Sequence, residues 1–270
     1  MRKLFVFLLL CCVVTTEASD FYFPAGANSG GLAHASVGDL NFWSAINNPA
    51  ASSFLSQVEI GVNYESRFNL DELSVKTIAL AYPNRFGTIT SSFQYFGYEV
   101  YNEFRYALGF ARKFGSNLGA SVQFCALGSR INPEIPTLYA FTFDASVYAK
   151  LSETLGLGFY VFNLPASQFK STEQNVEIPV LYRLGGEWML SNKLSVLGEV
   201  RGKNGEDPSF CGGTNYELLD GFEVSVGLAN NPFALTAGMQ YAKWGVTMGV
   251  SCAVIRQIGK VWNCSLAYGF

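Results

Sequence analysis

One histidine and a few cysteines are the main candidates for chemistry in this sequence of 270 residues. Lipases and proteases generally need a histidine beside a serine or an aspartate. The only histidine, His34, lies in a segment rich in glycine and alanine, so we interpret it as a structural residue. The sequence contains no Gly-x-Ser-x-Gly, HExxH or phosphate-loop motif. We therefore expect that the protein is not an enzyme.

Metal ligands and cofactor motifs are also scarce. Two acidic spots, Asp71-Glu72 and the Gly-Glu-Asp-Pro run at 205–208, lack the spacing of an EF-hand, and we interpret them as solvated loops. A single histidine cannot complete a Cys/His zinc set, and no CxxC motif is present. The four cysteines after the N-terminal region are Cys125, Cys211, Cys252 and Cys264. The sequence predicts no metal and no cofactor.

The composition excludes several classes of protein. Hydrophobic residues make up 49% of the chain and charged residues 14%, whereas soluble proteins carry about 25% charged residues. The net charge of −3 without a basic cluster argues against nucleic-acid binding. After residue 20 no apolar stretch approaches the ~20 residues that a membrane-spanning helix needs. A chain that is apolar overall, but nowhere continuously, is typical of a transmembrane β-barrel.

The N-terminus has the features of a secretory signal peptide over residues 1–18. Arg2 and Lys3 precede an eleven-residue apolar run from Leu4 to Val14. Small residues favour cleavage after Ala18, with Ser19 as the second choice. A lipoprotein signal around the Leu-Leu-Leu-Cys-Cys run is a weaker alternative, because small residues should precede the modified cysteine. The protein is therefore expected to leave the cytoplasm.

Residues 19–56 differ in pattern from the rest of the chain. A stretch of small residues, GANSGGLAHASVG, precedes the sequence DLNFWSAINNPAASSF, which predicts a short helix. Asp39 is expected to cap this helix, and Asn48-Pro49 to end it, because the residue before a proline avoids the helical region.

From residue 57 onward, apolar residues alternate with small or polar ones, as in a strand with one apolar face. Val58, Ile60 and Val62 share one face, for example, while Glu59 and Gly61 share the other. This pattern predicts fourteen strands, at about 57–66, 73–82, 86–96, 101–114, 116–127, 139–150, 154–163, 178–189, 193–201, 209–218, 221–229, 232–242, 244–255 and 260–270.

The connections and faces of these strands favour a barrel over the alternative, a soluble β-sandwich. Connections after even-numbered strands are short and those after odd-numbered strands are longer on average, as in barrels of the Gram-negative outer membrane. This asymmetry places both termini on the periplasmic side. One face is rich in aromatic residues, whereas the other is mostly small. The chain ends in Tyr268 and Phe270 on one face, which matches the C-terminal assembly signal of outer-membrane proteins.

The alternation of inward and outward side chains along each strand, here called the parity, predicts a set of charged side chains that point into the lumen. A turn around 190–192, closed by Met189 opposite Lys193, places Arg183 directly opposite Glu199. We expect these two side chains to form an ion pair, the alternative being that a wet lumen solvates both. The predicted lumen charges are Glu59, Arg105, Arg183, Glu187, Glu199, Arg201 and Glu223.

The last hairpin brings two cysteines to one face. A three-residue turn at 257–259 sets Cys252 opposite Cys264. A disulfide is one outcome in an oxidising compartment, and two free thiols are the favoured one, because direct cross-strand geometry often strains the bond.

The N-terminal pattern resembles that of the FadL-like outer-membrane transporter superfamily, and is closer still to the short PorV/PorQ-like barrels. The shared pattern is a small-residue stretch, an acidic residue, a short helix and then Asn48-Pro49-Ala50 just before the first strand. The resemblance implies an all-β fold, a 14-stranded antiparallel transmembrane barrel over 57–270 with residues 19–56 as an N-terminal plug containing a short helix. Asn48-Pro49-Ala50 is then the plug motif, and we expect it to seat the plug against the wall rather than to bind substrate.

The resemblance implies two alternative functions. One is a passive channel for small hydrophobic compounds, for which a gap to the lipid at the third strand, near 86–87 and 96–97, is expected. The other is a non-transporting scaffold barrel for protein secretion, of the PorV/PorQ type in type IX secretion, or for envelope assembly, with a gap-free lumen. The longest loop, about 164–179, is mostly polar, unlike the apolar loops of the transporters. The implied partners are membrane lipids, the barrel assembly machinery and, for the scaffold, secretion components.

Overall fold

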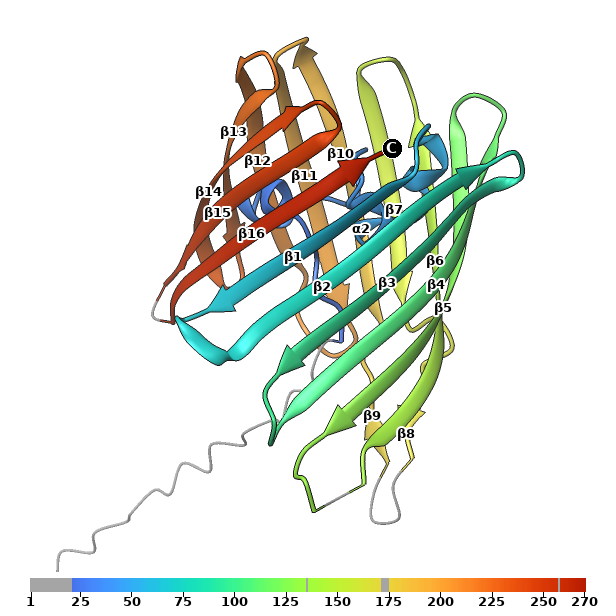
Figure 1. Ribbon diagram of the computed structural model, residues 1–270, viewed down its shortest axis with the longest axis vertical. Helices are drawn as coiled ribbons and strands as arrows, with labels where there is room; N and C mark the ends of the chain where they lie inside the picture. Colours follow the sequence, from blue (N-terminus) through green and yellow to red (C-terminus); the bar gives the residue numbers. More distant parts are fainter. Residues whose placement is uncertain (1–20, 135, 171–174, 257) are drawn as a thin grey trace, which may run out of the picture.

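The computed structural model describes residues 21–134, 136–170, 175–256 and 258–270, so the predicted signal peptide at 1–18 lies outside the described residues. Fourteen of its strands form a closed antiparallel barrel, in which β1 also pairs with β16 (Figure 1). These strands are β1 (Glu59–Arg67), β2 (Leu70–Asn84), β3 (Gly87–Gly97), β4 (Asn102–Phe114), β5 (Leu118–Arg130), β6 (Leu138–Lys150), β7 (Leu155–Phe162), β10 (Leu181–Ser191), β11 (Leu194–Lys203), β12 (Ser209–Leu219), β13 (Phe222–Asn230), β14 (Phe233–Lys243), β15 (Val246–Ile255) and β16 (Gly259–Gly269).

The predicted count of barrel strands is confirmed, and every end of these fourteen strands lies within three residues of its predicted position. The small hairpin of β8 (Gln168–Phe169) and β9 (Val176–Glu177), in the connection between β7 and β10, was not predicted.

The N-terminal region contains short helical turns. They are α1 (Ala27–Gly31), α2 (Ser44–Asn47) and the 3-10 helix η1 (Ala51–Phe54). The prediction that Asp39 caps the helix is wrong, because α2 starts five residues later and Trp43 occupies its N-cap without a side-chain hydrogen bond. α1 was not predicted, since its sequence of small residues carries no helical periodicity. None of the described helices has the length and apolar character required to cross a membrane.

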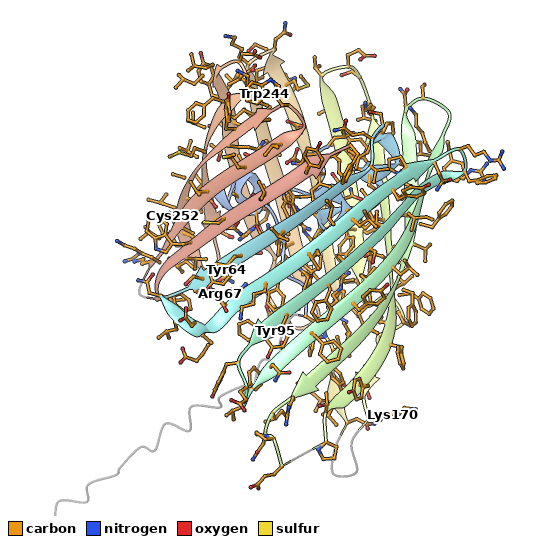
Figure 2. All side chains as sticks on the ribbon, in the orientation of Figure 1. Tyr64, Arg67, Tyr95, Lys170, Trp244 and Cys252 are labelled. Carbon is orange, nitrogen blue, oxygen red and sulfur yellow. The ribbon has the colours of Figure 1, made fainter. Side chains whose placement is uncertain are left out.

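The two faces of the wall differ as the alternation predicts. Large apolar side chains on the outer face are exposed, for example Val122 at 58% and Phe141 at 61%. Figure 2 shows such side chains projecting outward all along the strands, among them the labelled Tyr64. Inward positions carry small or polar residues instead. An exposed apolar band around a closed barrel is the surface that a bilayer covers, and a soluble β-sandwich is therefore excluded.

The two ends of the barrel differ in their connections. One end, here called the short-turn end, carries the C-terminus and connections of two to four residues, and Trp244 marks it in Figure 2. The opposite, long-loop end carries the connections at 131–137 and 163–180, and Lys170 marks it. The predicted asymmetry of the loops is therefore present.

Two predicted registers are wrong by two residues. Arg183 lies opposite Arg201, and Glu199 lies opposite Gly185, because the β10–β11 hairpin closes on Ser191 and Leu194 with a bulge at residue 190. In the last hairpin Cys252 lies opposite Trp262, because the connection starts one residue earlier than predicted. Both errors preserve the parity, so every one of these side chains keeps its predicted face.

The expected gap at the third strand is absent, because β3 pairs with β2 and β4 along its whole length without a register shift. The wall is instead less completely paired at β6. Its ladder with β7 covers only Ala145–Lys150. Nearer the long-loop end, β6 is paired instead with the connection that follows β7, where the Leu164 N–H donates to the Phe143 carbonyl at 2.9 Å.

The chain before the first strand, residues 21–58, is here called the N-terminal segment. Most of it is buried, and its hydrogen bonds reach inward-facing side chains of strands that are far apart around the ring. It therefore lies within the barrel, where Figure 1 shows it in blue. The strands contacted in this way include β3 through Gln94, β6 through Ser146, β11 through Glu199, β14 through Thr236 and β16 through Ser265.

Candidate functional site

The predicted ion pair between Arg183 and Glu199 is present inside the barrel. The Arg183 Nε atom lies 2.6 Å from Glu199 Oε1, and its Nη2 atom lies 2.8 Å from Oε2. Glu199 also accepts from Arg201 Nε at 2.7 Å. Both partners of the pair are buried, with side-chain exposures of 0% and 1%. A two-residue offset suits this pair, because a long arginine side chain reaches a diagonal neighbour on the next strand.

This pair holds the N-terminal segment as well as the wall. Glu199 Oε2 accepts from the backbone N–H groups of Ser36 and Val37, each at 2.9 Å. Arg183 donates to the Asn47 carbonyl at 2.9 Å and also to the Tyr22 hydroxyl. One arginine–carboxylate pair thus fastens three separate stretches of the segment to β10 and β11.

A second buried cluster surrounds Arg105 and adjoins the first at Tyr22, whose ring centroid lies 5.1 Å from Arg183 Cζ and 5.8 Å from Arg105 Cζ. Its Nη2 atom lies 2.6 Å from Asp144 Oδ2, and each side chain is 1% exposed. The Tyr160 hydroxyl donates to the same carboxylate oxygen at 2.8 Å. Asp144 Oδ1 accepts from the Asn163 N–H at 3.0 Å, which fixes the point where the chain leaves β7. The cluster therefore fills this part of the lumen with polar groups that bond to one another, although Arg105 Nε has no hydrogen-bond partner among the described residues.

A third set of charges lies near the long-loop end. Glu65 Oε1 accepts from Arg67 Nε at 2.7 Å, and Glu65 Oε2 lies 3.8 Å from His34 Nε2. Burial lowers the pKa of His34 to about 4, although the nearby Glu65 opposes this shift. His34 is therefore neutral near pH 7.

Charged side chains of the first and third clusters line a cavity of about 370 Å³ at the long-loop end. Its walls are mostly apolar, and residues of the loops at this end, such as Phe68 and Pro232, surround its mouth. A cavity of this size suits a small organic molecule. The apolar lining residues are Pro24, Ala33, Phe68, Leu181, Ala229, Pro232, Ala234, Ala253, Ile255 and Val261, and the polar ones include Tyr22, His34, Glu65, Arg67, Arg183 and Arg201. We call it the apolar cavity.

A second cavity, of about 340 Å³, lies at the short-turn end and has a polar lining. Asp39 of the N-terminal segment, Glu187 of β10 and Glu223 of β13 line this cavity, together with Lys150 of β6. Burial, and to a lesser degree the two glutamates, raise the pKa of Asp39 well above its usual value. Asn215 Nδ2 donates to Glu223 at 2.7 Å. We call it the polar cavity.

The predicted lumen charges thus fall into separate groups. Arg183, Glu199 and Arg201 form one network, Arg105 lies in a different cluster, and Glu187 and Glu223 line the polar cavity. Glu59 begins β1 opposite Gly269 and is only half-buried. Parity alone does not reveal this division, which depends on how far along each strand a residue lies.

The Asn48-Pro49-Ala50 motif lies against β6. Asn48 Nδ2 donates to the Val37 carbonyl at 2.6 Å and to the Val147 carbonyl at 3.3 Å, and the Ala50 N–H donates to Ser146 Oγ at 3.0 Å. α2 ends at Asn47, directly before the motif. The motif lines neither of the two cavities.

Tyr268 and Phe270 lie on the outer face at the short-turn end, with ring centroids 4.9 Å apart. The Phe270 N–H donates to the Val58 carbonyl at 2.9 Å, so the last residue extends the pairing of β16 with the start of β1.

Sequence reasoning missed several charged partners. Glu65 and Asp144 occupy inward positions of predicted strands, and the same parity rule identifies both. Tyr22 has no such signal, because it precedes the periodic part of the chain. Among the described residues, no group of three or more His, Cys, Asp or Glu side chains is arranged to hold a metal ion. Cys125, Cys211, Cys252 and Cys264 are free thiols.

Solved structures of other proteins share this fold. No protein-family model matches the sequence, and neither does any curated protein sequence. Solved structures do match. The CymD monoaromatic hydrocarbon channel aligns with a TM-score of 0.66 at 10% identity, over 91% of this chain and 97% of its own. The Pseudomonas putida toluene transporter TodX aligns with a TM-score of 0.66 at 12% identity, over 93% and 99%. A Pseudomonas aeruginosa FadL homologue aligns with a TM-score of 0.64 at 13% identity, over 93% and 100%.

These matches agree with the FadL-like part of the resemblance seen in the sequence. They give no support to the PorV/PorQ-like part or to a role in secretion. Identities of 10–13% establish a shared fold and not a shared ligand. The chain therefore has the fold of the FadL-like β-barrels.

Proposed function

We propose that the protein is a passive channel of the Gram-negative outer membrane for small hydrophobic compounds. The observation that carries this proposal is the apolar cavity, which lies within a FadL-like barrel and is surrounded by loops at one end. Aliphatic walls favour an apolar ligand, because transfer of apolar surface from water contributes about 25 cal/mol per Å² buried. The monoaromatic hydrocarbon channel and the toluene transporter with this fold support the same class of compound.

In this proposal the N-terminal segment is the plug, and Asn48-Pro49-Ala50 seats it against β6. The domains are then a signal peptide at 1–18, a plug at 19–56 and a barrel at 57–270. The short-turn end, which carries the C-terminus, faces the periplasm, and the long-loop end faces outward, as in outer-membrane barrels. The expectation that both termini lie at the periplasmic end does not fit the first described residue, because the Phe21 ring lies 5.1 Å from the ring of Phe169 at the long-loop end. The barrel assembly machinery inserts the protein, with Tyr268 and Phe270 as its signal, and lipids surround the apolar band.

Uptake by whole cells tests this function. A Gram-negative host that lacks its own hydrocarbon channels would express the protein, and uptake of radiolabelled toluene would be followed over seconds. We expect uptake several-fold faster than in cells with the empty vector. Replacing Ala234, which lines the apolar cavity, with phenylalanine should return uptake to the vector level, because the larger side chain occupies the cavity.

The matched control is Ala237→Phe on the same strand. Ala237 is exposed on the outer face, so the same added ring contacts lipid and should leave uptake unchanged. Equal uptake with the protein and with the empty vector would contradict the proposed function. Equal loss in both variants would mean that the cavity is not the binding site.

A further inference from the structure

The apolar and polar cavities reach the same part of the barrel wall. On β14, Thr236 lines the apolar cavity and Gln240 lines the polar one, and only one inward-facing residue, Gly238, lies between them. On β13 the corresponding residues are Ala229 and Glu223. The two cavities are therefore successive spaces along one side of the lumen, separated by a thin layer.

That layer is α1, which packs against β13, β14, β15 and β16. Asn28 of α1 lines the polar cavity, whereas Ala33 and His34, just after α1, line the apolar one. The packing has no room for side chains. A Cβ atom at Gly31 would lie 3.0 Å from the Cα atom of Gly238, and one at Gly30 would lie 3.5 Å from the Cβ atom of Ser251.

The contact between α1 and the wall is tight, and its hydrogen bonds to β13–β15 come from Thr236, whose Oγ1 atom donates to the Gly31 carbonyl at 2.6 Å and accepts from the Ala33 N–H at 3.1 Å. Ser225 Oγ, which faces Gly31, is buried and has no hydrogen-bond partner among the described residues, and Asn263 Oδ1 beside Gly30 has none there either. An unpaired buried polar atom costs free energy that a polar guest can recover. The Arg183–Glu199 pair, by contrast, holds the chain after α1 firmly to β10 and β11. Of the two attachments, the one at β13–β15 is the easier to open.

We propose that the route from the apolar to the polar cavity runs between α1 and the inner face of β13–β15, with the Gly30–Gly31 contact as its constriction. This inference rests on the proposed channel function and specifies its solute. The constriction is lined by Ser225, Thr236 and Ser251, and the polar cavity by amides and carboxylates. A pure hydrocarbon such as toluene leaves these groups unpaired, which slows its passage. The solute that passes fastest to the short-turn end has an apolar body and one neutral hydrogen-bonding group, as in an aromatic alcohol.

A disulfide between α1 and the wall tests the route. The Cβ separation of 3.5 Å between positions 30 and 251 lies within the range of natural disulfides. Cells would express the full-length protein carrying Gly30→Cys and Ser251→Cys, with Cys252 and Cys264 replaced by alanine. Uptake of radiolabelled benzyl alcohol would be measured after oxidation and again after reduction. We expect at least a fivefold loss on oxidation and full recovery on reduction.

The matched control ties the N-terminal segment to the opposite wall. A Cβ atom at Gly119 would lie 2.5 Å from Ser53 Oγ, so Ser53→Cys with Gly119→Cys allows a disulfide between η1 and β5. Oxidation of this pair should leave uptake unchanged. Equal uptake by the oxidised and reduced forms of the 30–251 pair, with the disulfide confirmed by mass spectrometry, would overturn the proposed route. Uptake in wild-type cells no faster than in vector cells would instead contradict the channel function itself.

A second variant applies if the double substitution does not assemble. Ser225→Cys alone places a thiol in the proposed constriction, and a negatively charged, membrane-impermeant methanethiosulfonate would be added to the cells. We expect its reaction to block benzyl alcohol uptake, because the bulky adduct lies between α1 and β13. Complete labelling of the thiol introduced at position 225, with no change in uptake, would also overturn the route.

Discussion

Replacing Arg183 with alanine should release the N-terminal segment from the barrel wall. The wild-type guanidinium lies 2.6 and 2.8 Å from the two oxygens of Glu199 and donates to the Asn47 carbonyl at 2.9 Å. Removing one partner of a buried ion pair costs about 3–5 kcal/mol. We take the lower value, about 3 kcal/mol, because Arg201 still faces Glu199 in the variant. Since about 1.4 kcal/mol corresponds to a tenfold change, the undocked population should rise roughly 100-fold.

Hydrogen exchange in detergent micelles measures this release. The N–H groups of Ser36 and Val37 donate to Glu199, so peptides covering 33–48 should exchange roughly 100-fold faster in the variant. Arg183→Lys keeps the charge but not the two-pronged geometry, and should give an intermediate rate. Lys193→Ala, in the exposed turn after β10, is the control and should not change exchange. Wild-type exchange in Arg183→Ala, with the barrel still folded, would refute the reasoning.

Three further predictions concern the barrel and the N-terminal segment. Unboiled protein should migrate differently from boiled protein on SDS gels, because a closed barrel has no free edge; identical migration would contradict closure. Deleting Phe270 should lower the amount of folded, heat-modifiable protein in the outer membrane more than Lys193→Ala does, and normal assembly would argue against a terminal signal. The contribution of His34 to docking should weaken as the pH falls from about 6.5 to about 4, because the pKa of His34 is lowered to about 4 and the undocked form binds the proton more readily, whereas the raised pKa of Asp39 acts in the opposite direction. The segment of His34→Asn should therefore keep more of its protection in acid than that of the wild type, with exchange corrected for intrinsic rates, and a larger loss in the variant would contradict the sign.

The strands and their faces could be predicted from the sequence because the period of two is a local property. Alternation around Val122 or Phe141 already indicates which side chains face outward. Registers depend on the turn, and one bulge at residue 190 was enough to shift Arg183 from Glu199 to Arg201. The predicted ion pair is still present, because a shift of two residues leaves both side chains on the inner face.

The candidate cavities could not be predicted in the same way. They depend on the path of residues 21–58 through the lumen, and this path is fixed by contacts between residues far apart in sequence, such as Ser36 with Glu199. The small residues of α1 have no periodicity, yet Gly31 allows the close approach to Gly238, and Gly30 the approach to Ser251, that separate the two spaces. The alternation along a strand predicts which side chains point into the lumen. The contacts of those side chains depend on the path of the N-terminal segment inside the barrel.

Crystals grown with bromobenzene would test most directly where a hydrophobic compound binds. The bromine atom scatters anomalously and marks the position of the ring without reference to activity. We expect its strongest peak in the apolar cavity, among Leu181, Ala234 and Ala253, and loss of that peak in Ala234→Phe. Bromine found only in the polar cavity, or only on the lipid-facing surface, would contradict a channel that admits hydrophobic compounds at its long-loop end.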